Sequence, residues 1–215
     1  HNSAGLSTFW KKIQEILKIP ALSDQDIEEY NKFIEDARQN QMLKDEILKL
    51  SHSDIFEGKS LIEDRENTSQ IHIISQGEYT IADSRQKRYI ATFGASDCII
   101  VAVYNHEQKR GGMAHIDAVR DEIATLELML KAVLEQKQTS TESASIKIVI
   151  LGGSPASTNS ILNLYKTIKE LESKGIKIDL VIGEVLSGES QSLALDLETG
   201  EIMRFKVSPT LHPDL

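Results

Sequence analysis

The chain has very little cysteine: among its 215 residues, Cys98 is the only one. A single thiol cannot form a disulfide within the chain, so a structural crosslink of that kind is excluded. The lack of a disulfide pattern also favours a reducing compartment. Two roles remain for Cys98, a small buried apolar side chain or a reactive group, and free cysteines most often have the first.

Long apolar runs and an excess of basic residues are also missing. The longest apolar run, from Cys98 to Tyr104, is far shorter than the roughly 20 residues that cross a bilayer. The 24 Lys and Arg residues against 33 Asp and Glu give a formal net charge of −9. Nucleic acids and anionic membranes both bind clustered Lys and Arg, so we expect neither as a partner. The opening residues are typical of a truncation point, and without a secretory signal there we expect a cytoplasmic protein.

Residues 1–66 carry helical periodicity and almost no strand signal, which predicts a helical N-terminal extension. Ser7 is a candidate N-cap, and Ser23 with Asp26 resembles a capping box in which Asp replaces the usual Glu. Three helices are expected here. Their apolar positions are Phe9, Ile13, Ile16 and Leu17 in the first, Ile27, Tyr30, Ile34 and Ala37 in the second, and Met42, Leu43, Ile47 and Leu50 in a short third.

From residue 67 the pattern changes to short segments rich in β-branched and aromatic residues, separated by turn residues. These segments predict strands at 71–75, 79–82, 88–93, 98–104, 146–151, 176–182, 192–197 and 201–206, and apolar periodicity predicts helices at 117–136 and 156–173. Thr199 and Gly200 predict a hairpin between the last two strands. We therefore expect residues 67–215 to form one α/β domain.

His115 is a candidate partner for Cys98. A cysteine nucleophile needs a nearby base or cation to populate its thiolate. Gly111 and Gly112 are expected to form a tight turn that leads into a short strand ending at His115. If that strand and the one starting at Cys98 form a hairpin, the thiol and the imidazole lie at the same open end.

Thr92 could supply the third part of such a site, because its hydroxyl or carbonyl could orient the imidazole. The turn beginning at Gly94 could hold a developing oxyanion with its backbone N–H groups, next to Ser96 and Asp97. Other motifs are weak. Gly152-Gly153 lacks the Gly-Lys-Ser/Thr of a phosphate-binding loop, and we find no His, Cys and Asp residues at metal-binding spacing.

The stretch from Gly77 to His115 resembles the bacterial chemoreceptor glutamine deamidases of the CheD family. The positions in register are Thr92, Cys98, Tyr104, Gly111, Gly112, Met113 and His115. Residues 146–153 (IKIVILGG), Asn159 and residues 195–200 (LDLETG) are similar to the C-terminal half of that family. The resemblance extends over residues 71–207, about two-thirds of the chain.

This resemblance implies a layered α-β-β sandwich, also found in toxin deamidases of the cytotoxic necrotizing factor type. The implied reaction converts a glutamine side chain of a target protein to glutamate with release of ammonia. Cys98 would attack the carboxamide and form a thioester. His115 would act as general base and acid, and Thr92 would orient His115. The resemblance implies no metal and no cofactor.

Two departures from the family pattern leave the target open. The family usually has Gly-Ser before the cysteine, where this chain has Ser96-Asp97, and the compact members lack a counterpart of residues 1–66. The target could therefore differ from a chemoreceptor, as for an effector or toxin acting in a host cytosol. The N-terminal asparagine and glutamine amidohydrolases also resemble this layout. A third alternative is a non-catalytic module that binds a regulatory protein partner.

Overall fold

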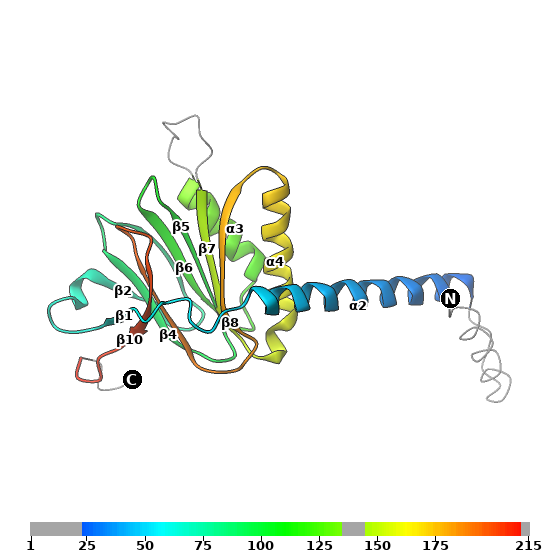
Figure 1. Ribbon diagram of the computed structural model, residues 1–215, viewed down its shortest axis with the longest axis horizontal. Helices are drawn as coiled ribbons and strands as arrows, with labels where there is room; N and C mark the ends of the chain where they lie inside the picture. Colours follow the sequence, from blue (N-terminus) through cyan, green and yellow to red (C-terminus); the bar gives the residue numbers. More distant parts are fainter. Residues whose placement is uncertain (1–22, 135–144, 212–215) are drawn as a thin grey trace. The chain divides into compact units, whose positions relative to one another are not determined.

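The computed structural model describes residues 23–134 and 145–211, in which two β-sheets and two helices follow one long helix (Figure 1). The helices are α2 (Asp24–Leu50), α3 (Glu122–Leu134) and α4 (Thr158–Ser173), with 3₁₀ turns η1 (Thr68–Gln70) and η2 (Pro155–Ser157). The strands are β1 (Ser60–Ile62), β2 (Ile71–Ile73), β3 (Tyr79–Asp83), β4 (Tyr89–Ala95), β5 (Ile99–Asn105), β6 (Arg110–Ile116), β7 (Ser145–Gly152), β8 (Lys177–Val185), β9 (Gln191–Asp196) and β10 (Ile202–Lys206).

Helix α2 replaces two of the predicted helices. Residues 24–50 form one continuous helix, because this segment contains no glycine or proline that would interrupt it. The predicted capping box is confirmed: the Asp26 N–H donates to Ser23 Oγ at 3.1 Å, and the Ser23 N–H donates to Asp26 Oδ2 at 2.9 Å. The helix predicted after Ser7 lies outside the described residues. The chain divides into two compact units within α2, one ending at Leu43 and the other beginning at Lys44.

Strand β1 lies in a region expected to be helical. Its three residues pair in parallel with β10, with Ser60 opposite Arg204. A strand this short leaves almost no local pattern, and its partner lies at the far end of the sequence. Ile47, Phe56 and Leu61 are all buried, so residues 44–66 contribute to the core of the unit that carries the sheets. A domain boundary at residue 66 stays a prediction.

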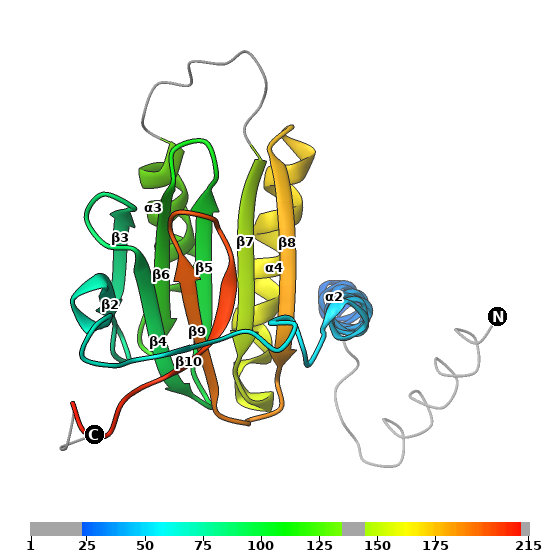
Figure 2. The same cartoon turned by 60° about the vertical axis from the view of Figure 1, so that its left-hand side comes forward.

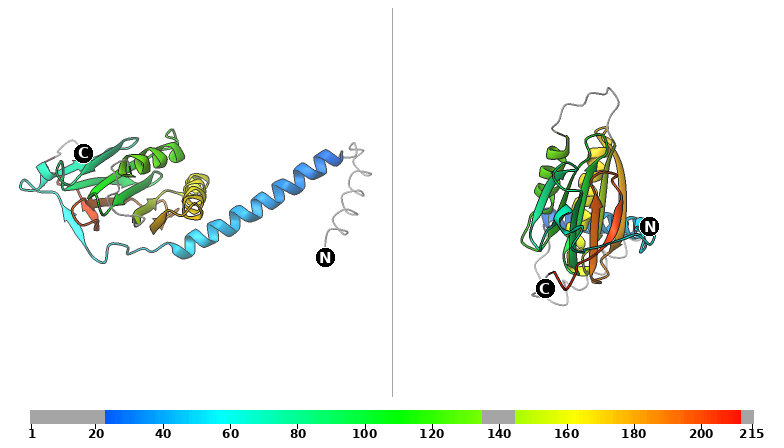
Figure 3. Two further views of the ribbon diagram at one scale, coloured as in Figure 1. Left: turned by 90° about the horizontal axis from the view of Figure 1, so that it is seen from above. Right: turned by 90° about the vertical axis from the view of Figure 1, so that its left-hand side faces the viewer.

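The two sheets and two helices form the three layers of an α-β-β sandwich, as the sequence predicted. One sheet has the order β3-β6-β5-β7-β8 and the other β1-β10-β9-β4-β2. In Figure 2, β9 and β10 lie in front of β5, with α3 and α4 behind it. Figure 3 shows both helices on the side of the first sheet that faces away from β10. The expected hairpin of β9 and β10 is confirmed by their antiparallel pairing.

The core between the sheets forms because apolar side chains of both alternate toward the same layer. Ile100 and Leu151 of the first sheet and Leu193 and Leu195 of the second are fully buried there. Burial of such side chains contributes roughly 25 cal/mol per Å² of apolar surface, so this layer stabilises the packing of the two sheets.

Gly111 and Gly112 do not form a turn. Both lie inside β6, and the turn that joins β5 to β6 lies before Arg110. A Cβ at Gly111 would come within 2.7 Å of a Leu197 methyl group, and one at Gly112 within 3.2 Å of Met129. The missing side chains therefore let β6 approach the second sheet on one face and α3 on the other.

Candidate active site

Cys98 lies in the bend between β4 and β5, one residue before β5 begins. Strands β5 and β6 pair antiparallel, with Ile99 opposite Ile116 and Ile100 opposite His115. Cys98 is therefore a diagonal neighbour of His115 at one end of the hairpin, roughly 7–8 Å away by ordinary sheet geometry. The predicted hairpin is confirmed, and it brings together two residues that are far apart in the sequence.

Thr92 contacts the imidazole from the opposite sheet. Its hydroxyl donates to the carbonyl oxygen of Ile74 at 2.9 Å and lies 2.8 Å from Nδ1 of His115. A hydroxyl has only one proton, and the Ile74 carbonyl can only accept. We therefore assign the proton between Thr92 and His115 to Nδ1, which leaves Nε2 as the unprotonated nitrogen. Thr92 thus holds the ring in one tautomer and one orientation.

The free nitrogen of His115 is buried. His115 is only 3% exposed, and its Nε2 has no hydrogen-bond partner among the described residues. Buried polar atoms without a partner are uncommon and often have a functional role. An unprotonated Nε2 near a thiol can accept the proton that the thiol loses during attack.

Burial keeps both groups of the pair uncharged. It raises the pKa of the Cys98 thiol, and the charges of Asp117 and Asp97 raise that pKa further. Burial lowers the pKa of His115, against a smaller opposing effect of Asp117. Both shifts favour a thiol and a neutral imidazole as the resting forms. Proton transfer to Nε2 must accompany the attack.

Residues that follow β7 form hydrogen bonds with the backbone at Cys98. The Gly153 N–H donates to the Cys98 carbonyl at 2.8 Å, and Ser157 Oγ donates to the Asp97 carbonyl at 2.7 Å. Gly152 has a φ of +87°, and a Cβ there would lie 2.7 Å from the Cys98 carbonyl oxygen. From the sequence, Gly152 and Gly153 were considered only for phosphate binding. Two glycines at the end of a buried strand can indicate close contact with a neighbouring backbone, and this was the sequence signal for their contact with Cys98.

The bend before Cys98 begins at a β-bulge. Gly94 has a φ of +76°, and the register of β4 with β9 shifts between Thr92 and Ala95. The amides of Ser96, Asp97 and Cys98 donate no hydrogen bond to any described residue. These amides are therefore free to donate hydrogen bonds, and the oxyanion role expected for this turn stays a prediction. The Asp97 side chain is exposed, so its effect on the thiol is only electrostatic.

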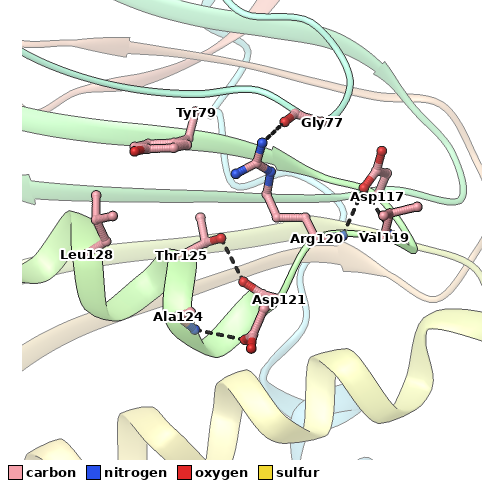
Figure 4. Close-up of a pocket in the computed structure, with 9 residues that line it drawn as sticks. All are labelled: Gly77, Tyr79, Asp117, Val119, Arg120, Asp121, Ala124, Thr125 and Leu128. Carbon is pink, nitrogen blue, oxygen red and sulfur yellow. Dashed lines mark hydrogen bonds between the residues drawn. The ribbon is translucent and has the colours of Figure 1, made fainter.

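A cavity of about 520 Å³ opens beside the hairpin end (Figure 4). Gly77 and Tyr79 line one wall, Thr125 and Leu128 of α3 line another, and Asp117 lies in the connection between β6 and α3. Asp117 was not among the residues predicted for the site. Its position two residues after His115 was the available signal, because alternate residues of a strand point to the same face.

Residues 23–134 and 145–211 contain no group of three or more His, Cys, Asp or Glu side chains that could hold a metal ion. Within the same ranges, none of the helices has the length and apolar character needed to cross a membrane.

Comparison with known families identifies a deamidase-type amidohydrolase family. Residues 63–194 match the family described as protein N-terminal asparagine amidohydrolase. This match covers more than half of the chain and includes Thr92, Cys98 and His115, so the chain belongs to that family. No curated protein matches the chain. The resemblance to CheD stays a prediction.

Proposed function

We propose that this protein hydrolyses the side-chain amide of an asparagine at the N-terminus of a protein substrate, giving aspartate and ammonia. The observation that carries the proposal is the hydrogen bond between Thr92 and His115, which leaves a buried, unprotonated Nε2 at the hairpin end where Cys98 lies. Family membership favours asparagine at a chain terminus over the internal glutamine that the CheD resemblance implies.

The first half of the reaction forms a thioester. The Cys98 sulfur attacks the carboxamide carbon while its proton moves to Nε2 of His115. The resulting oxyanion accepts hydrogen bonds from the free amides of the bend at Ser96–Cys98. When the C–N bond breaks, the imidazolium returns the proton to the leaving nitrogen, and ammonia departs.

The second half releases the product. Nε2 of His115 takes a proton from a water molecule, which attacks the thioester carbon. Collapse of that intermediate breaks the C–S bond, and the imidazolium gives its proton to the sulfur. The products are an aspartate carboxyl group and the original thiol. Thr92 keeps the same imidazole nitrogen available in both halves through its contact with Nδ1.

Hydrolysis of an internal glutamine is the second candidate, because the same Thr92, Cys98 and His115 are the positions shared with the CheD family. The two candidates differ in substrate and not in mechanism. A terminal asparagine presents a free α-amino group close to its carboxamide, whereas an internal glutamine has none.

The test compares peptides that begin with asparagine or glutamine with folded proteins that carry internal glutamines. Ammonia release and amide-to-acid conversion, mapped by mass spectrometry, are measured with wild type and with Cys98→Ala. We expect conversion of the N-terminal asparagine by wild type only. Conversion confined to internal glutamines would overturn the proposed substrate. Absence of any Cys98-dependent conversion would favour the non-catalytic binding module.

A further inference from the structure

Asp117 and Cys98 are the first residues beyond the paired end of the β5–β6 hairpin. Ile99 pairs with Ile116, so an extension of this register by one residue would place Asp117 opposite Cys98, and the Asp117 charge does act on the Cys98 thiol. Opposite residues of an antiparallel pair lie on the same face, with Cβ atoms roughly 4.5–5.5 Å apart. A carboxyl group therefore lies next to the candidate nucleophile, at the end of β6 that also carries His115.

The Asp117 carboxylate has unused binding capacity. Its Oδ1 accepts the N–H groups of Val119 and Arg120, at 3.2 and 3.1 Å. Its Oδ2 accepts no hydrogen bond from the described residues, and Asp117 forms no ion pair with any of them. The nearby Arg120 guanidinium instead bonds the Gly77 carbonyl and lies over the Tyr79 ring, 5.4 Å from its centroid (Figure 4).

The lining of the cavity includes two acidic side chains, Asp117 and Asp121, and the basic Arg120, but neither Cys98 nor His115. Asp117 lines this cavity, and its charge acts on both Cys98 and His115. Asp121 also lines the cavity, but its carboxylate accepts the Ala124 N–H at the start of α3. Together with the unpartnered, buried Nε2 of His115, these features define a place for a substrate that brings an amide and a positive charge.

The geometry of a terminal asparagine fits these two groups. Its α-ammonium is joined to the carboxamide carbon through the α and β carbons, so the two lie roughly 3–4 Å apart. When that carbon is at the Cys98 sulfur, the ammonium group falls within reach of the Asp117 carboxylate. We propose that Asp117 binds the α-ammonium group of the substrate's first residue. This inference rests on the proposed function.

The same contact would couple substrate binding to activation of the thiol. In the free protein, the Asp117 charge opposes formation of the Cys98 thiolate. A bound ammonium group neutralises that charge, so the thiol loses its proton more easily when the correct substrate is present. A substrate without the ammonium group leaves the opposing charge in place.

The test uses two peptides that differ only in the α-amino group: one begins with asparagine, and the other with the same residue lacking its amine. Wild type should hydrolyse the first with a kcat/KM about 10- to 100-fold higher, the contribution of a hydrogen bond to a charged group. Asp117→Asn should reduce this preference to near unity. The asparagine amide can still accept the Val119 and Arg120 N–H groups, so we expect the variant to fold. Asp121→Asn removes a carboxylate from the same cavity, keeps a helix-capping side chain, and should retain the preference.

Binding measurements separate this inference from the proposed function. With Cys98→Ala, which cannot form a thioester, calorimetry should show tighter binding of the peptide with the free amine. Adding Asp117→Asn should abolish the difference. If neither peptide is hydrolysed by wild type but this difference in binding is found, the proposed function fails and the inference is supported. Equal binding of both peptides, or an unchanged preference in Asp117→Asn, would overturn the inference.

Discussion

Thr92 of β4 and His115 of β6 belong to different sheets, and one hydrogen bond of 2.8 Å joins them inside the sandwich. The two residues are 23 positions apart in the sequence and nearly or fully buried. Packing of the sheets therefore determines which nitrogen of His115 is available for chemistry. Four predictions on the site and the fold can be tested with single substitutions or with a pH series.

Replacing Thr92 with valine keeps the shape of the side chain and removes the hydroxyl. The Nδ1–H of His115 then lacks its partner, which should lower kcat/KM about 10- to 100-fold and destabilise the fold by about 1–3 kcal/mol. Thr92→Ser should restore most of the activity because it returns the hydroxyl. Nitrogen NMR of the imidazole reports the tautomer directly. Wild-type activity and an unchanged tautomer in Thr92→Val would contradict the assigned role.

The pH dependence of kcat/KM should show that the Cys98 thiol and the His115 imidazole are both uncharged in the active form. Burial lowers the pKa of His115, so activity should fall only below about pH 6.5, as the imidazole becomes protonated. Burial and the nearby acids raise the pKa of Cys98, so the alkaline fall should lie above about pH 8.5. An initial-rate series across this range measures both limbs. An acidic limb centred above pH 7 would show that His115 is not held neutral.

A methyl group at Gly152 should displace the nucleophile. Gly152→Ala places a Cβ 2.7 Å from the Cys98 carbonyl oxygen, so the bend must move and kcat should fall at least about 10-fold. Gly175→Ala is the matched control: its φ of +93° is equally unfavourable, but nothing lies within 4 Å. Both variants should lose about 1–2 kcal/mol of stability from backbone strain. Equal activity of the two would show that contact with Cys98 is unimportant.

The C-terminal part of α2 should stabilise the unit that carries the sheets. Ile47 is 1% exposed, so Ile47→Ala should reduce the free energy of unfolding by about 2–5 kcal/mol. Leu48 is 45% exposed in the same helix turn, and Leu48→Ala should cost much less. Urea unfolding measures both. A similar loss in the two variants would mean that Ile47 does not pack in a core.

Local pattern predicted much of the fold but missed some of its elements. The strands that became β4, β5, β7 and β8 were recognisable because they are long and rich in β-branched or aromatic residues. Strand β1 has three residues and a partner near the C-terminus, so no local signal marks it. The turn expected at Gly111-Gly112 was wrong because glycine also serves where two layers approach closely, and sequence alone does not separate these uses.

The sequence by itself determined which reactive groups are available: one thiol, a histidine at the end of a short strand, and a threonine upstream. It also determined the hairpin that brings Cys98 and His115 to one end, because strand pairing follows local order. Only the tertiary structure decided the tautomer of His115 and the burial that favours the neutral forms of Cys98 and His115. Those properties depend on desolvation and on partners from distant strands, and a linear pattern contains neither.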